Sequence, residues 1–170
     1  MPECFLDTNL VEFLLERPNS VNHKKGNSSV AGTMKDKRFE DSFVVGIIDD
    51  DKRKLKELED CLDYKNLWLK GLKIFKKPEK QHYFIQLSPA IEKWILNECE
   101  KGNIDLEKYN LPGNFQELKN LKGLTQRNDQ RFKKLFREMA DNQKCDEMIE
   151  LKRWLLFLKQ NNYNTNLDLL

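Results

Sequence analysis

The sequence lacks several features that would assign a function directly. Its four cysteines, Cys4, Cys61, Cys99 and Cys145, form no CxxC pair, so they do not resemble a zinc site. No apolar run approaches the length of a membrane span, and no signal peptide is visible. We therefore expect free thiols, a cytoplasmic location and no contact with a membrane.

A strong excess of charge of one sign is also missing. The 170 residues include 30 basic and 28 acidic side chains, which gives a formal net charge of +2. This balance does not indicate a protein dedicated to binding nucleic acid, so any phosphate-binding site must be local. Ten Phe and three Trp supply the large apolar side chains that a core needs.

Hydrophobic patterning predicts an α/β fold. The clearest strand covers residues 42–48, a nearly continuous apolar run that is typical of a strand buried on both faces. Further strands are expected at 2–5, 20–23, 72–76 and 82–87, the last two as a hairpin. Helices are expected at 10–15, 30–34, 52–62 and 88–102, with Asp7 and Ser88 as N-caps of the first and last. The alternation favours a mostly parallel sheet flanked by helices.

The C-terminal third has the spacing of helices alone. Apolar positions predict helices over 114–122, 128–141 and 146–159, followed by an irregular, asparagine-rich end. We therefore divide the chain into an α/β domain, residues 1–102, and a helical extension, residues 103–170, packed on it. Trp94, Trp154, Phe132 and Phe136 lie at helical spacing and are expected in the core.

Acidic residues stand at the ends of two predicted strands. Glu3 and Asp7 flank the end of the first, and Asp49 and Asp51 follow the strand at 42–48. Ligands of open α/β sheets bind at the carboxyl ends of strands, and residues i and i+2 of an extended segment face the same side. Asp50 then points away. Carboxylate oxygens are ligands for Mg²⁺ or Mn²⁺, so the four residues form a candidate metal site.

Simpler explanations of the same residues remain open. Acids after a buried strand are often a solvated turn at the start of a helix, and Asp7 alone is expected as an N-cap. Two like charges 4 Å apart repel by about 4 kcal/mol at an effective dielectric of 20. A bound cation would relieve that repulsion, but protonation of one carboxyl or a nearby Lys25 or Lys52 would relieve it too.

Two segments together resemble the motifs of TOPRIM-type domains. Glu3-Cys4-Phe5-Leu6-Asp7 resembles their first motif, and Val44-Val45-Gly46-Ile47-Ile48-Asp49-Asp50-Asp51 resembles the second, a hydrophobic strand that ends in DxD. His23 and residues 26–30 are similar to the intervening segment of OLD-like and stand-alone bacterial TOPRIM proteins, and residues 83–94 to a later segment. The resemblance covers about residues 1 to 100.

The resemblance implies a TOPRIM-like fold and magnesium-dependent phosphodiester chemistry on nucleic acid or nucleotide. Asp49 and Asp51 would coordinate the metal, and Glu3 would act as general acid/base or as a further ligand. His23, Lys25 and Gly26 are candidates for contacting a phosphate, and Glu92 is a candidate supporting acid.

Topoisomerase activity is not expected, since no partner domain and no tyrosine in a recognisable motif are present. The alternative is a non-catalytic binding or regulatory module with a protein or nucleic-acid partner, in a defence or mobile-element setting.

Overall fold

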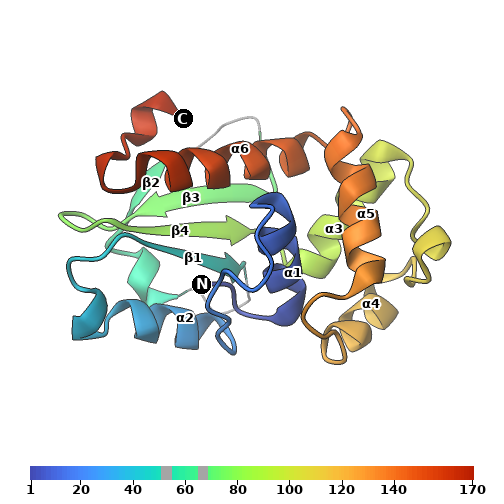
Figure 1. Cartoon of the computed structure of the whole chain (residues 1–170), viewed down its shortest axis with the longest axis horizontal. Coiled ribbons are helices and arrows are strands. Elements are labelled where there is room, and N and C mark those ends of the chain that lie inside the picture. The colour runs from blue at the N-terminus through green and yellow to red at the C-terminus, as the bar shows by residue number, and fades with distance from the viewer. Residues whose placement is uncertain (51–54, 65–68) are drawn as a thin grey trace.

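The computed structural model describes residues 1–50, 55–64 and 69–170, and its centre is a four-stranded mixed sheet (Figure 1). The strands are β1 (Val44–Asp49), β2 (Leu62–Tyr64), β3 (Leu72–Lys76) and β4 (His82–Leu87), in the order β1-β4-β3-β2. The chain is thus α/β as predicted. A mostly parallel sheet is not confirmed, because only β1 and β4 run parallel and β3 is antiparallel to both of its neighbours.

Strand β1 is buried on both faces, as its apolar run predicts. Ile47 belongs to one hydrophobic cluster and Ile48 to another. Helix α2 (Asn27–Met34) covers the Ile48 face at very short range. A Cβ atom at Gly46 would lie 2.9 Å from both Val30 Cγ1 and Met34 Sδ, so only glycine permits this contact.

The other face of the sheet carries a larger layer of helices (Figure 1). They are α1 (Phe5–Leu14), α3 (Ile91–Gly102), α5 (Gln130–Asp141) and α6 (Asp146–Asn161), while α4 (Phe115–Lys122) packs on α3. The C-terminal helices share one hydrophobic cluster with α1 and the sheet, and Trp94, Trp154, Phe132 and Phe136 are buried in it as expected. The division at residue 102 stays a prediction.

The expected first strand is reduced to a single bridge. Pro2 pairs with Ile47 in parallel, and α1 begins at Phe5. The bridge extends the sheet beyond β1 for one residue. It thereby places Glu3 at the same sheet edge as Asp49, where β1 ends.

Some boundaries differ from the prediction because side chains satisfy the backbone in unexpected ways. Residues 20–23 form no strand: the Val21 amide is bonded to the Glu12 carboxylate instead of a neighbouring strand. The N-cap of α1 is Cys4, and Asp7 lies three residues later. Helix α3 has Ala90 as its N-cap, not Ser88.

The prediction of a helix at 52–62 is also wrong for those of its residues that the structure describes. Residues 51–54 lie outside the described residues. The remainder forms a short 3₁₀ turn, Lys56–Leu58, and then enters β2. Other 3₁₀ turns are Lys37–Phe39, Leu106–Tyr109, Asn162–Asn164 and Leu167–Leu169, the last two within the segment expected to be irregular.

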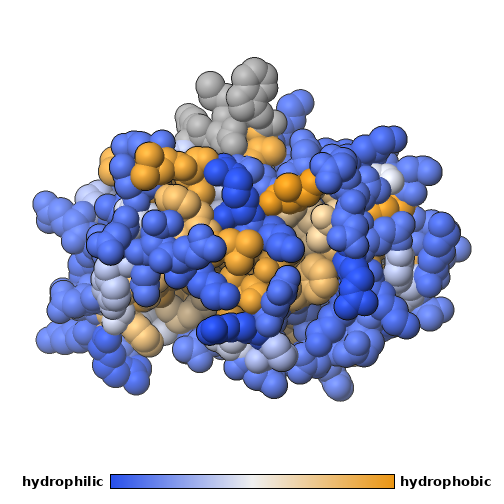
Figure 2. All heavy atoms as spheres, turned by 45° about the horizontal axis from the view of Figure 1, so that its top comes forward, coloured by the Kyte–Doolittle hydropathy of each residue, from blue (hydrophilic) through white to orange (hydrophobic). Residues whose placement is uncertain are grey.

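Hydrophilic atoms cover much of the face shown in Figure 2, and the hydrophobic atoms between them form separate patches. Exposed large apolar side chains include Leu62, Leu124, Tyr163 and Leu169, which come from different segments. Scattered apolar residues of this kind are normal on protein surfaces. Among the described helices, none is both long enough and apolar enough to span a membrane.

Candidate functional site

Buried carboxyl groups gather beyond the end of β1. Glu3, Asp7, Asp49 and Glu92 are each less than 10% exposed, at 7%, 0%, 3% and 3%. They come from the N-terminal bridge, α1, β1 and the first turn of α3. The structure therefore brings together three of the four predicted metal ligands and adds the predicted supporting acid. We call these four residues the carboxyl cluster.

A lysine that the sequence did not single out lies among them. The Lys122 ammonium is 2.9 Å from Asp49 Oδ2, 3.2 Å from Glu92 Oε1 and 3.7 Å from Glu3 Oε1. Of the two lysines expected in this role, Lys25 makes no ion pair among the described residues and Lys52 lies outside them. Lys122 is the last residue of α4, so the C-terminal helices contribute to the site.

Several contacts hold the end of α4 against α1. Beyond α4, Asn9 accepts a hydrogen bond from the Asn128 amide at 2.7 Å and donates one to the Gln126 carbonyl at 2.8 Å. Glu12 forms an ion pair with Arg127. The loop at 126–128 is thus fastened to the same helix that carries Asp7, which fixes where Lys122 enters the carboxyl cluster.

Asp49 is fully engaged in the structure. Its Oδ1 accepts a hydrogen bond from the Ile91 amide at 2.9 Å, in the uncapped first turn of α3, while its Oδ2 contacts Lys122. The helix N-terminus favours a negative charge there. The Asn27 side chain bonds both backbone groups of Asp49, at 3.0 and 3.2 Å, which orients the end of β1.

Asp7 takes part in a capping box rather than acting as the N-cap. Its Oδ2 accepts hydrogen bonds from the Cys4 amide at 3.1 Å and the Cys4 thiol at 2.8 Å. The other oxygen, Oδ1, is buried without a hydrogen-bond partner among the described residues, and so is Glu3 Oε2. Two buried carboxylate oxygens in one site are thus without a donor while both groups are ionised, which is costly.

The pKa values reflect this shortage of positive charge. Burial, followed by repulsion from Asp49, raises the pKa of Glu3 to about 9 and that of Asp7 to about 8. A protonated Glu3 can donate a hydrogen bond to Asp49, which two ionised carboxylates cannot do. Burial lowers the pKa of Lys122, but attraction to Asp49 outweighs it and leaves that pKa above its usual range. Protonation of Glu3 and Asp7 would thus reduce the negative charge that Lys122 has to balance.

The other predicted site residues lie at the rim. His23 stacks on Phe5, and the Gly26 amide donates to the Glu3 carbonyl at 3.0 Å. Lys25 is exposed between them. Asp50 points to the opposite face of the sheet, where it accepts a hydrogen bond from Ser88 Oγ at 2.8 Å. Asp51, predicted as a ligand, lies outside the described residues.

No family model, curated protein or solved structure matches the chain. Among the residues described, no three His, Cys, Asp or Glu side chains are arranged to hold a metal ion. In the carboxyl cluster, the Lys122 ammonium takes the place between Glu3, Asp49 and Glu92.

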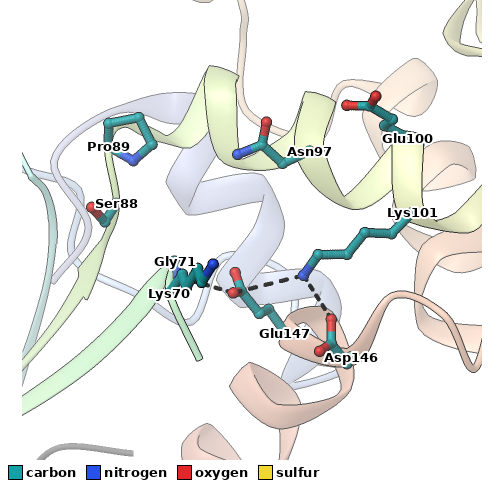
Figure 3. Close-up of a pocket in the computed structure, with 9 residues that line it drawn as sticks. All are labelled: Lys70, Gly71, Ser88, Pro89, Asn97, Glu100, Lys101, Asp146 and Glu147. Carbon is teal, nitrogen blue, oxygen red and sulfur yellow. Dashed lines mark hydrogen bonds and ion pairs between the residues drawn. The ribbon is translucent and has the colours of Figure 1, made fainter. Parts of the chain in front are cut away.

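A hollow opens beyond the end of β4, between α3 and the start of α6 (Figure 3). It has a volume of about 600 Å³, and Lys101 pairs there with Asp146 at 2.7 Å and Glu147 at 3.7 Å. Glu147 also accepts hydrogen bonds from the Gly71 amide and the Trp94 indole, at 2.9 and 2.8 Å. These ion pairs and hydrogen bonds join the start of α6 to α3 and to the sheet, so the charged residues of this hollow have a structural role.

Proposed function

We propose that the chain performs magnesium- or manganese-dependent chemistry on phosphodiesters of nucleic acid or nucleotide, in the manner of a nuclease-like TOPRIM protein. The observation that carries the proposal is the pair of buried oxygens, Glu3 Oε2 and Asp7 Oδ1, which have no hydrogen-bond partner in the part of the chain that the structure describes. They belong to a cluster in which, among the described residues, four buried carboxyls face one ammonium.

The donor atoms in the carboxyl cluster are oxygens, which are the type of ligand that a hard divalent cation binds. Carboxylate oxygens are the ligands that Mg²⁺ and Mn²⁺ prefer, and Glu3 and Asp7 have oxygens to offer. Their protons would leave on binding, because a ligating carboxyl must be ionised. Asp49 and the predicted Asp51 would complete the set. Such a cation would stabilise negative charge on the phosphoryl group and lower the pKa of a bound water.

The chain's own residues have distinct roles in this proposal. Glu3 has one of two roles: it would act as general acid/base if it keeps the proton that its raised pKa provides, or as a further ligand once that proton has left. Lys122 would exchange its contact with the carboxyl cluster for a phosphate oxygen, where its charge favours the transition state. Asp49 accepts a hydrogen bond from the Ile91 amide and thereby holds the first turn of α3 against the carboxyl cluster.

The test is turnover by the purified protein on single-stranded DNA, duplex DNA, RNA and nucleotides with Mg²⁺ or Mn²⁺. We expect cleavage that EDTA abolishes and that Glu3→Gln and Asp49→Asn each reduce by about 100-fold or more. Glu117→Gln, which changes an exposed carboxyl on α4, is the matched control. Absence of turnover together with no metal-dependent rise in melting temperature would refute the proposal.

The second candidate is a non-catalytic binding or regulatory module. The position of Lys122 favours it, since a built-in ammonium partly neutralises the carboxyl cluster without a metal. In that case the cluster is structural. A complex with protein or nucleic acid would then persist in Glu3→Gln, and its loss in that variant, together with loss of turnover, would reject this candidate.

A further inference from the structure

An exposed aromatic pair lies next to the carboxyl cluster. Phe5 is two residues after Glu3, and its ring stacks on His23 with centroids 4.2 Å apart and an angle of 9° between the planes. Phe5 is the first residue of α1 and remains 37% exposed. What distinguishes Phe5 from the other exposed apolar residues is that its ring is stacked on a second ring, the half-buried His23, and that both lie close in sequence or by hydrogen bonding to Glu3.

The pair is held in place by contacts that also hold Glu3. The His23 ring lies 3.3 Å from the Thr8 hydroxyl through Nδ1. The loop after it is bonded along the N-terminal bridge, because the Lys24 amide donates to the Pro2 carbonyl at 2.9 Å and the Gly26 amide to the Glu3 carbonyl at 3.0 Å. A pre-ordered platform loses little side-chain entropy when a ligand binds.

Positive charge accompanies the platform. Lys24 and Lys25 follow His23 directly, and neither forms an ion pair with any residue that the structure describes. Burial lowers the pKa of His23, which favours the neutral form of its ring. The platform therefore offers an aromatic stacking face and, directly after it in the chain, two lysines able to meet phosphates.

We propose that Phe5 and His23 stack a base of a single-stranded nucleic acid whose backbone phosphates contact Lys24 and Lys25. This inference rests on the proposed function, for which it names the substrate. A base in a duplex has both faces covered by its neighbours, whereas a base in a single strand is free to stack on an aromatic ring.

Binding is measured by fluorescence anisotropy in EDTA, so that metal chemistry plays no part. The probes are labelled 12-mers of dT and of rU, which separate DNA from RNA, and a DNA duplex of the same length. We expect the single strands to bind at least tenfold more tightly than the duplex. Phe5→Leu, which keeps an apolar side chain but removes the ring, should weaken binding by about 5- to 150-fold.

Three further variants sharpen the test. Phe5→Trp should retain binding because it restores a ring. Tyr163→Ala removes an exposed aromatic side chain from the C-terminal segment and should leave binding unchanged. Lys25→Gln should reduce the slope of log affinity against log salt by about 1, which a purely structural role would not do. Melting temperatures verify that each variant is folded.

The outcomes separate this inference from the proposed function. A parent protein that binds no single strand, binds duplex equally well, or binds as tightly after Phe5→Leu would overturn the platform. Cleavage that is undiminished in Phe5→Leu would support the phosphodiester chemistry but reject a role for the platform in it. Ring-dependent binding without cleavage under any metal would keep the platform and reject the chemistry.

Discussion

Replacing Lys122 by methionine should destabilise the protein in a way that depends on pH. The substitution keeps an apolar chain of similar length but removes the ammonium that lies 2.9 Å from Asp49 Oδ2 and 3.2 Å from Glu92 Oε1. A buried carboxylate left without its partner is costly, typically by about 3–5 kcal/mol. The cluster can limit that cost by taking up one more proton.

The free energy needed to keep that additional carboxyl protonated determines how much the substitution destabilises the fold. An ordinary Asp side chain has a pKa of about 3.9, so keeping one protonated costs about 4 kcal/mol at pH 7 and about 1.5 kcal/mol at pH 5. A carboxyl whose pKa is raised in the folded state contributes most below its unfolded pKa and loses that contribution as the pH rises. Lys122→Met should therefore lower the free energy of unfolding by about 4 kcal/mol at pH 7 and by about 1.5 kcal/mol at pH 5.

Urea denaturation followed by tryptophan fluorescence measures both values. Lys119→Met, on the same helix, removes an exposed lysine whose described contact is with the Phe115 ring at 5.8 Å, and should cost about 0.5 kcal/mol or less. If Lys122→Met costs less than about 1 kcal/mol, or equally much at both pH values, the electrostatic account of the cluster is wrong. Should the cluster bind metal, Mg²⁺ at 100 times its dissociation constant would restore about 2.7 kcal/mol.

Three other substitutions have defined outcomes. Glu3→Gln should raise the melting temperature more at pH 8 than at pH 5, because the Glu3 pKa of about 9 makes the parent lose stability across that range whereas a neutral amide does not titrate. Glu147→Ala should lower the urea midpoint by an amount equivalent to about 3 kcal/mol, because it leaves the buried Trp94 indole without its acceptor. Gly46→Ala should cost about 1–3 kcal/mol by overpacking, while Gly113→Ala, with open space around the added Cβ, should cost far less in the same assay.

Elements with strong local patterns could be predicted from the sequence. Strand β1 was identified by its apolar run, and β3, β4, α4, α5 and α6 by their periodicity, because these signals need only neighbouring residues. The hairpin predicted for β3 and β4 is confirmed, since the two strands pair antiparallel. The neighbours of each strand in the sheet could not be predicted in this way, because no local pattern records that β4 lies beside β1 and that β2 joins at the far edge.

The candidate site was predictable only in part for the same reason. Glu3, Asp7 and Asp49 follow from strand ends and from motif spacing. Lys122 does not, because it is 73 residues from Asp49 and one of many lysines on amphipathic helices. Asn27 likewise resembled an ordinary loop residue until its amide was seen to bond both backbone groups of Asp49.

The distance along the chain between Asp49 and Lys122 has a consequence for synthesis. Ribosomes add about 5–20 residues per second, so the 73 residues from Asp50 to Lys122 take roughly 4–15 s to make. During that interval β1 and α1 are already available, but the ammonium that balances their carboxyls is not. Until then the carboxyl groups at this edge must stay exposed to solvent, remain protonated, or bind a cation from solution. Only after α4 has been synthesised can the carboxyl cluster become buried with Lys122 as its counter-charge.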